Sequence, residues 1–364
     1  MWATDNGVEV GLDGGRRRHM IRGAISGFGA VAARAHLPGW QSRPGIDIVA
    51  IHDPVAARRH HAINLIRNIR VYDNLELMLD GEALDFVDIA SPPAFHAAAA
   101  QLALDASVNV IVEKPLCFDA GELAQLSSLA ARNDRLLMCV HNWKYSPAYR
   151  RAHELISAGR LGQVQYVSLV RMRDGPAGNG LNGMGDSERW RLDRKRGGGI
   201  LIDHGWHTFY LAHWLMGGET PLSVSSHLQF DSASGVDHLA DLRIEFSGGR
   251  MVNVHLTWRA PVRRTSTVIL GTAGLLEMEG DRLLLTERSG QATDHSITDI
   301  PEDSYHAGWF MAAAADFERV LADGAGAELA QSNLREAATA LALTDAARQS
   351  DAQDGRAIVL NPLE

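Results

Sequence analysis

Lys114 is the residue whose position in the sequence points most directly to chemistry. It lies in Glu113-Lys114-Pro115, directly after the apolar run 108–112, where a buried strand is expected to end. A buried lysine that lies beside a second positive charge, such as that of a cationic ligand ring, has a lowered proton affinity and can donate a proton to a substrate oxygen. The alternative is a surface ion pair followed by a loop proline. A cis bond before Pro115 would redirect the lysine.

A second group of polar residues lies in the glycine-rich stretch 197–207. Asp203 and His207 are four residues apart, so on a helix their side chains share one face. A histidine that an acid orients can serve as the base that alcohol oxidation requires. A metal site, with His204 and His213, is an alternative, although no cysteine joins them and the spacing is poor, so we expect none. Polar core residues satisfied by their neighbours are the other alternative.

A glycine-rich turn separates the apolar run 20–25 from a helix-compatible segment. It reads Gly27-Phe28-Gly29-Ala30-Val31-Ala32, a G-x-G-x-x-A pattern. The first glycine permits the tight turn, the second lets backbone approach a pyrophosphate, and Ala32 lets the helix pack closely. Asp53 follows the second apolar run, where an acid binds the ribose hydroxyls of NAD and repels a 2′-phosphate. The sequence thus predicts NAD, while Arg58 and Arg59 keep NADP as an alternative.

These residues need elements to position them, and the first part of the chain alternates strand-like and helix-like patterns. Apolar runs of strand length span 20–25, 46–51, 86–90, 108–112 and 135–140. Helices are expected over 30–42, 54–67, 74–80, 94–105 and 119–132. This alternation predicts a doubly wound α/β domain over residues 20–143, a Rossmann domain with a parallel sheet and its ligand crevice at the strand carboxyl ends. Residues 1–19 are expected to form a flexible tail.

From residue 144 the pattern changes to consecutive strands. Strands are expected over 163–173, 221–230, 236–246, 250–260, 264–270 and 273–287, and helices over 146–158, 199–216, 304–323 and 330–350. The pattern predicts an α+β domain over residues 144–364 with an open, mostly antiparallel sheet. The outer face of such a sheet needs covering, so we expect a homodimer or homotetramer through this sheet.

The composition narrows the class of protein without naming its chemistry. The 364 residues are 46% hydrophobic and 22% charged, which is typical of a globular protein with a large core. Two cysteines are too few for a disulfide framework, and we expect a cytoplasmic location. The net charge of −9 and the absence of a long apolar run speak against nucleic-acid and membrane partners. A small molecule is the expected partner.

Taken in order, the motifs resemble the Gfo/Idh/MocA family, which includes glucose–fructose oxidoreductase and inositol dehydrogenase. The resemblance covers about residues 20–361, and the residues that carry it are the G-x-G-x-x-A turn, Ser91-Pro92-Pro93 with His96, Glu113-Lys114-Pro115, Trp190-Arg191 and the run Gly197-Gly198-Gly199-x-x-x-Asp203-x-Gly205-x-His207. It implies hydride transfer between a nicotinamide and the carbon that bears a sugar or cyclitol hydroxyl. Lys114 would hold the reacting oxygen, His207 would take the hydroxyl proton, and Asp203 would orient substrate or histidine.

The resemblance also implies which residues line the two halves of the site. The nicotinamide side would comprise Ser91, Pro92, His96 and Glu113, and the substrate side would comprise Lys144, Trp190 and Arg191. The chain departs from the family in two places: Tyr210 stands where an acid is usual, and Lys144 where an arginine is common. The loop 174–189, with five glycines, either closes over the substrate or is merely a disordered surface loop.

Our interpretation is an NAD-preferring dehydrogenase or ketoreductase for a sugar, a cyclitol or a derivative. Two other classes stay open on the same fold. In an NAD-assisted glycosidase or lyase, a transient oxidation permits elimination and the cofactor is not consumed. The other class is a non-catalytic nucleotide-sensing regulator, in which a proton relay of Lys114, Asp203 and His207 would have no use.

Overall fold

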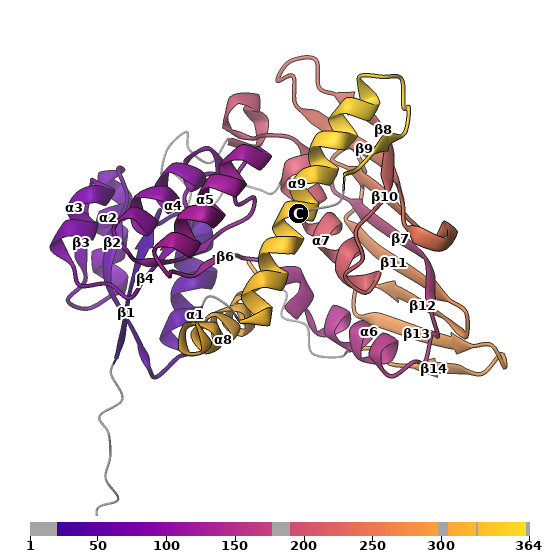
Figure 1. The fold of residues 1–364 in the computed structure, drawn as a ribbon, viewed down its shortest axis with the longest axis horizontal. Coiled ribbons are helices and arrows are strands. Elements are labelled where there is room, and N and C mark those ends of the chain that lie inside the picture. Colours follow the sequence, from indigo (N-terminus) through magenta and orange to yellow (C-terminus); the bar gives the residue numbers. More distant parts are fainter. Residues whose placement is uncertain (1–19, 177–189, 298–304, 325–326, 362–364) are drawn as a thin grey trace, which may run out of the picture.

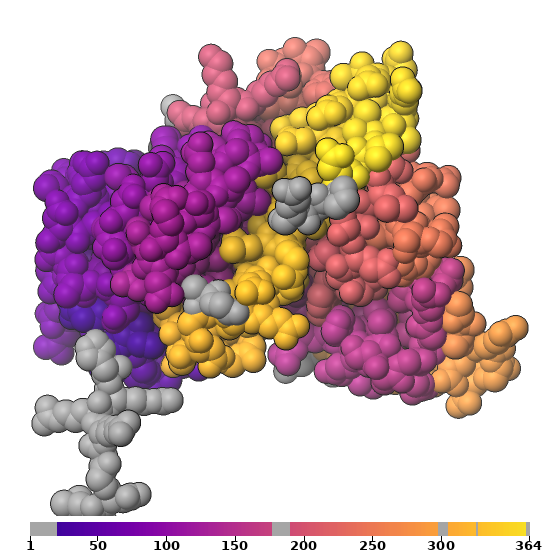
Figure 2. All heavy atoms as spheres, viewed as in Figure 1, coloured from indigo at the N-terminus to yellow at the C-terminus, as the bar shows by residue number. Residues whose placement is uncertain are grey.

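The computed structural model describes residues 20–176, 190–297, 305–324 and 327–361, so the predicted tail 1–19 lies outside them. These residues form two units, one around a parallel sheet with helices on both faces and one around a larger sheet with helices on a single face (Figure 1). Figure 2 shows the two C-terminal helices packed between the units. None of the described helices is long and apolar enough to cross a membrane.

The first unit confirms the predicted doubly wound domain. Its strands are all parallel and follow the order β3-β2-β1-β4-β5-β6. They span β1 Ile21–Ser26, β2 Ile46–His52, β3 Arg70–Tyr72, β4 Phe86–Ile89, β5 Asn109–Val112 and β6 Leu137–Cys139. The sequence pattern predicted all of these except β3. That edge strand is three residues long and only partly buried, so it carries no continuous apolar run.

The helices of the first unit begin at capping residues where the sequence offers them. They are α1 Leu37–Gln41, which continues a π-helical turn at Ala32–His36, then α2 Ala56–Leu65, α3 Leu75–Gly81, α4 His96–Asp105 and α5 Ala120–Arg132. Asn74 accepts from the backbone N–H of Leu77, and Asp119 accepts from that of Glu122. These bonds satisfy donors that a helix start leaves free, which fixes where α3 and α5 begin.

The second unit contains the predicted open sheet, in the order β14-β13-β12-β11-β7-β10-β9-β8-β15. Its strands span β7 Val164–Met172, β8 Ser223–Phe230, β9 Asp237–Glu245, β10 Met251–Thr257, β11 Arg264–Gly271, β12 Gly274–Glu279, β13 Arg282–Glu287, β14 Ala292–Asp294 and β15 Ile358–Val359. Only β7 and β10 pair in parallel. The predicted strand 273–287 is two strands, because Gly280 takes a positive φ of 61° and turns the chain back.

Of the four other α-helices that the structure describes, three pack on the inner face of this sheet and one packs against the first unit. They are α6 Pro147–Ser157, α7 Trp206–Leu215 after a π-helical turn at Leu201–Gly205, α8 Ala307–Asp323 and α9 Glu328–Asp351. The predicted division at residue 144 assigns α8 to the second domain. In the structure Phe310 and Phe317 of α8 are buried with Trp40 in the core of the first unit. The chain therefore returns to complete the first unit.

Candidate active site

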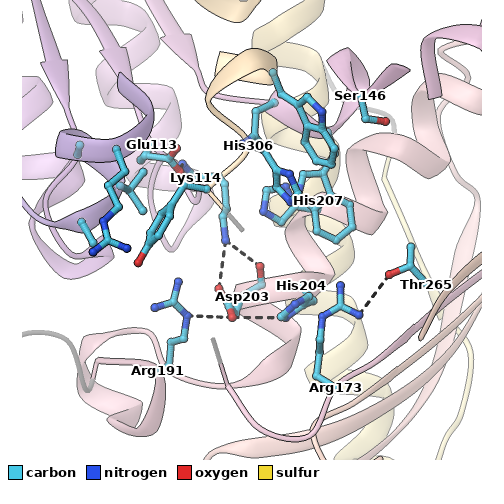
Figure 3. A pocket seen from close by; sticks show the side chains of 18 of the residues that line it. Glu113, Lys114, Ser146, Arg173, Arg191, Asp203, His204, His207, Thr265 and His306 are labelled. Atoms are coloured by element: carbon cyan, nitrogen blue, oxygen red, sulfur yellow. Dashed lines mark hydrogen bonds and ion pairs between the residues drawn. The ribbon is translucent and has the colours of Figure 1, made fainter. Parts of the chain in front are cut away.

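A cavity of about 1020 Å³ lies where the carboxyl ends of the first sheet face the inner side of the second (Figure 3). Residues of the glycine turn line one end, and residues of β11 and β12 line the other. Asp203, His204 and His207 enter its wall from α7 and the turn before it. The cavity thus occupies the edge of the parallel sheet where α/β domains bind ligands.

Lys114 follows β5 and crosses the cavity toward the second unit. Its Nζ donates to the backbone oxygen of Asp203 at 2.7 Å and lies 3.3 Å from Asp203 Oδ1. The peptide bond between Lys114 and Pro115 is cis. The side chain of Lys114 is 10% exposed and lines the cavity, so the ammonium is held in place and still open to a ligand.

Asp203 is held between two cations. Its Oδ2 accepts from Arg191 Nε at 3.0 Å, and its Oδ1 faces Lys114. Burial opposes ionisation of this carboxyl, but the charges of Arg191 and Lys114 outweigh burial and hold the pKa of Asp203 well below its usual range. Asp203 is therefore an anion at any working pH, and it positions both cations.

His207 lies in the first turn of α7, stacked on Trp143 with ring centroids 4.3 Å apart. Its Nδ1 lies 2.8 Å from Tyr210 Oη, which accepts from the backbone N–H of Trp143 at 3.0 Å. The spacing predicts Asp203 as the partner of the imidazole, but in the structure the partner is Tyr210. Burial, followed by the charge of Lys114, holds the pKa of His207 well below its usual range, so the ring is neutral near pH 7.

A second charged cluster, absent from the predicted site, fixes Glu113 at the edge of the cavity. His36 Nε2 lies 3.1 Å from Glu113 Oε1, and His36 Nδ1 lies 2.9 Å from Asp88 Oδ2. Burial lowers the pKa of His36, but the carboxylates of Asp88 and Glu113 outweigh it and raise the pKa to about 9. One signal in the sequence points to the cluster. Asp88 is an acid inside the apolar run 86–90, and a buried carboxylate needs a partner.

The His36 cluster predicts a specific loss of stability at high pH. Because the pKa of His36 rises from 6.5 to about 9 on folding, its contribution is full below pH 6.5 and is lost as the pH rises through 9. The shift corresponds to about 3 kcal/mol. In urea unfolding, His36→Gln should be less stable than the wild type at pH 6.5, and the difference should shrink toward pH 9.5. His60→Gln, at an exposed position, is the control. A difference that does not change with pH would contradict a charged His36.

The glycine turn provides the open space that a dinucleotide needs. A Cβ at Gly27, whose φ is 92°, would lie 2.5 Å from the backbone nitrogen of Ser91, so the strand and the next turn approach closely here. A Cβ at Gly29 would meet nothing within 4 Å. Gly29, Ala30 and Val31 line the cavity and lead into a helix, whose first N–H groups favour an anion. This end of the cavity therefore fits a pyrophosphate.

Asp53 is buried beneath this end of the cavity. Its oxygens accept from the backbone N–H groups of Phe28 and Val55, both at 2.8 Å. Arg58 Nη1 lies 3.5 Å from Asp53 Oδ2, and Arg58 lines the cavity. Gly27, Phe28 and Asp53, predicted as cofactor contacts, are not among the lining residues and instead hold the shape of the turn.

The other residues predicted for the nicotinamide side lie together. Ser91, Pro92, His96 and Glu113 all line the cavity. His96 bridges two segments, because its Nδ1 lies 2.6 Å from the backbone oxygen of Pro115 and its Nε2 lies 2.7 Å from that of Ser91. The imidazole thus ties the end of β4 to the segment that carries Lys114.

Lys144, predicted to face the substrate, does not line the cavity. Its Nζ lies 2.6 Å from Oε2 and 2.7 Å from Oε1 of Glu336 on α9. His141 Nδ1 lies 2.8 Å from Glu336 Oε2. The prediction of a substrate contact is corrected here, because a carboxylate 192 residues later in the chain takes up the ammonium. A local pattern in the sequence cannot reveal such a partner.

Trp190 and Arg191 do line the cavity, and the Arg191 guanidinium lies 4.4 Å from the centre of the Trp190 ring. The predicted closing loop 174–189 lies mostly outside the described residues. Within the described part of the chain no three metal-ligating side chains are grouped, and His213 Nδ1 lies 2.9 Å from the backbone oxygen of Glu219.

The cavity also contains residues that the motifs did not indicate. Several of them are aromatic or cationic, among them Trp143, Tyr149, Arg173, Arg263 and Trp309. The sequence contains one indication of Trp143, since it directly precedes Lys144, which the family resemblance places on the substrate side. Arg173 and Arg263 flank strands and belong to none of the sequence motifs, so only the fold brings them to the cavity.

Comparison with known families matches two consecutive parts of the chain. Residues 21–141 match the oxidoreductase family with an NAD-binding Rossmann fold, and residues 149–277 match the GFO/IDH/MocA C-terminal domain. Together the two matches span most of the chain, and they meet close to the predicted division between the domains.

Individual relatives have low identity but long coverage. The D-glucoside 3-dehydrogenase of Escherichia coli strain K12 is 27% identical over 307 residues, which cover 79% of this chain and 84% of that protein. The dTDP-3,4-didehydro-2,6-dideoxy-alpha-D-glucose 3-reductase of Streptomyces violaceoruber is 27% identical over 344 residues, 91% of this chain and 95% of that one. The crystal structure of GenD2 from gentamicin A biosynthesis in complex with NAD has a TM-score of 0.79 at 24% identity, and the match covers 97% and 99% of the two chains.

Proposed function

Because the chain belongs to the Gfo/Idh/MocA family of NAD(P)-dependent oxidoreductases, we propose that it interconverts a secondary alcohol and a ketone on a sugar, a cyclitol or a derivative. The observation that carries this proposal is the position of Lys114 Nζ in the cavity, between the glycine turn and the Asp203 segment. Two relatives support the reaction class, since one is named a glucoside 3-dehydrogenase and the other a 3-reductase of a dTDP-linked hexose.

Each of the three polar residues has a separate role in this reaction. Lys114 donates a hydrogen bond to the reacting oxygen, and Asp203 keeps the ammonium aimed into the cavity. His207 is neutral, so it can accept the hydroxyl proton in the oxidation direction and return it in reduction. This role requires the tautomer in which Nδ1–H donates to Tyr210 Oη, 2.8 Å away, because Nε2 is then free as the base. When bound, the nicotinamide accepts or supplies the hydride.

NAD is the cofactor that we propose as preferred. Asp53 places a carboxylate under the end of the turn where the ribose would lie, and a carboxylate repels a 2′-phosphate. Arg58 beside it is the feature that favours NADP instead. The ratio of kcat/KM with the two cofactors measures the balance, and a clear preference for NADP would contradict the role given to Asp53.

A screen of sugars, inositols and their keto forms with both cofactors tests the proposed function. Net oxidation or reduction changes the absorbance of reduced nicotinamide in proportion to product. An NAD-assisted glycosidase or lyase would form product without a net change in that absorbance. A nucleotide-sensing regulator would bind cofactor and turn over no member of the panel. Either result would overturn the proposed hydride transfer.

Tyr210→Phe tests how His207 is held. The variant removes the hydroxyl that lies 2.8 Å from His207 Nδ1 but keeps the aromatic ring. We expect kcat to fall by about 10- to 100-fold, because the base loses its orientation. Tyr145→Phe, whose hydroxyl binds Asp316 away from the cavity, is the matched control. An equal loss in both variants would exclude a specific role for Tyr210.

In the wild type, the loss of kcat/KM toward acid pH should begin only below pH 6.5. The reason is that the pKa of His207 is lowered, so the base stays neutral down to that pH.

We also propose that the open sheet forms a homodimer or homotetramer. No described helix covers the outer face of this sheet, and Leu270 and Leu284 are exposed on its strands (Figure 1). A second copy would cover such a face by an isologous contact. Sedimentation velocity measures the state directly, and a monomer at micromolar concentration would contradict the proposal.

A further inference from the structure

The sheet wall of the cavity carries two arginines from neighbouring strands. Arg173 follows β7, and Arg263 precedes β11. Arg173 Nη1 makes all three hydrogen bonds of this guanidinium, to Met172 O at 2.8 Å, Thr265 Oγ1 at 3.2 Å and Arg264 O at 3.3 Å. One edge of Arg173 is thus anchored to the sheet, while Nε and Nη2 have no partner among the described residues. A guanidinium fixed in this way is pre-organised for an anion.

Among the described residues neither arginine has a carboxylate partner. The described acids that line the cavity are Glu113, Asp203 and Asp281. Glu113 is hydrogen-bonded to His36, and Asp203 forms ion pairs with Lys114 and Arg191. Asp281 lines the same end but forms no ion pair with either arginine. Burial first, and then repulsion from Arg263 and Arg171, lowers the pKa of Arg173 to about 10.

Arg171 adds further positive charge from beneath the wall. It is fully buried on the inner face of β7 and hydrogen-bonds to Tyr149 Oη and to the backbone oxygen of Ser266, without a carboxylate among the described residues. Arg171 does not line the cavity, so its effect on a ligand is through its field. Positive charge therefore gathers at this end of the cavity, which favours a ligand that brings negative charge.

One residue, His204, lies between the arginine end of the cavity and the end where Lys114 lies. His204 lies between Asp203 and Arg173 in the wall (Figure 3). Burial lowers the pKa of His204 to about 3, so the ring is neutral, and its Nδ1 lies 3.4 Å from Asp203 Oδ2. A ligand whose hydroxyl reaches Lys114 would therefore cross a neutral polar ring before it meets the guanidinium of Arg173.

We propose that Arg173 and Arg263 form a subsite for an anionic group of the substrate, a carboxylate or a phosphate. The substrate is then an acidic or phosphorylated derivative of a sugar or cyclitol rather than a neutral one. This inference rests on the proposed function for what happens at Lys114, but binding of the anion does not require turnover. The two statements can therefore fail separately.

The test is calorimetric binding to the NAD-loaded protein. The probes are glucose, galactose and mannose, the matching uronic acids and the matching 6-phosphates. We expect at least one anionic probe to bind about tenfold or more tightly than its neutral parent, with an affinity that falls as salt rises. Preference for the uronic acids identifies a carboxylate subsite, and preference for the phosphates a phosphate subsite. If no anion binds more tightly than its parent, the subsite is overturned.

Arginine variants assign the binding to the subsite. Arg173→Gln and Arg263→Gln should each reduce the ratio of anionic to neutral affinity by about tenfold. Arg263 is exposed and forms no hydrogen bond with the described residues, so its variant tests the proposal even if Arg173→Gln folds poorly. The control is Arg264→Gln, which removes the same charge from the next residue, where Arg264 pairs with Glu279 outside the cavity. An equal loss in the control would overturn the subsite. Arginine-dependent anion binding without hydride transfer to any probe would retain it and count against the proposed function.

Discussion

Lys114→Ala is expected to lower kcat/KM by about 10³- to 10⁴-fold while NAD still binds with near-normal affinity. The ammonium is the donor that Asp203 aims into the cavity, and no other described lysine lines that cavity. Removing it leaves the reacting oxygen without its charged hydrogen bond in the transition state. The glycine turn, where the pyrophosphate would bind, is untouched. Steady-state kinetics and NAD titration by protein fluorescence measure the two effects.

The control for this variant is Lys195→Ala, at an exposed position of the same residue type. Its kcat/KM should equal that of the wild type. If Lys114→Ala retained a tenth or more of wild-type activity, Lys114 would not hold the reacting oxygen. If it lost NAD binding as well, the variant would have disturbed the domain rather than the chemistry.

Glu336→Gln is expected to destabilise the protein by about 3–5 kcal/mol, because it leaves the Lys144 ammonium buried without its counter-charge. Burial opposes the ionisation of Glu336, but Lys144 and His141 outweigh it and lower the pKa to about 2. The stabilisation from Glu336 is therefore present above pH 4.5 and is lost as the pH falls toward 2. The difference between wild type and variant should shrink over the same range. Urea unfolding at several pH values measures it.

The matched control is Glu154→Gln, which breaks the exposed ion pair of Arg151 and Glu154. Its cost should stay below about 1 kcal/mol. The double variant Lys144→Met, Glu336→Met should recover part of the stability lost in Glu336→Gln, because it removes both charges. A loss in Glu336→Gln no larger than in the control would mean that the buried pair contributes nothing.

The site was predictable wherever its residues depend on local spacing. The glycine turn, the end of β5 with Lys114 and the helix with Asp203 and His207 all converge on one cavity. The strand pattern is sufficient for this, since parallel strands present their carboxyl ends at one edge. The pairing of Asp203 with His207 failed as a prediction for a physical reason. Two residues on one helix face need not bond when stronger cationic partners lie nearby.

The sequence by itself determined the two-domain architecture, the dinucleotide turn and the place of Lys114, because periodicity and short motifs encode local structure. Only the tertiary structure decided which charges neutralise one another. His36 with Glu113 and Lys144 with Glu336 are paired by the packing of segments that lie far apart in the chain. The tertiary structure also places Lys144 outside the cavity and places Arg173 and Arg263 in its wall. A charge is stabilised by what lies within a few ångströms in space, and for the long-range pairs the spacing along the chain does not carry that information.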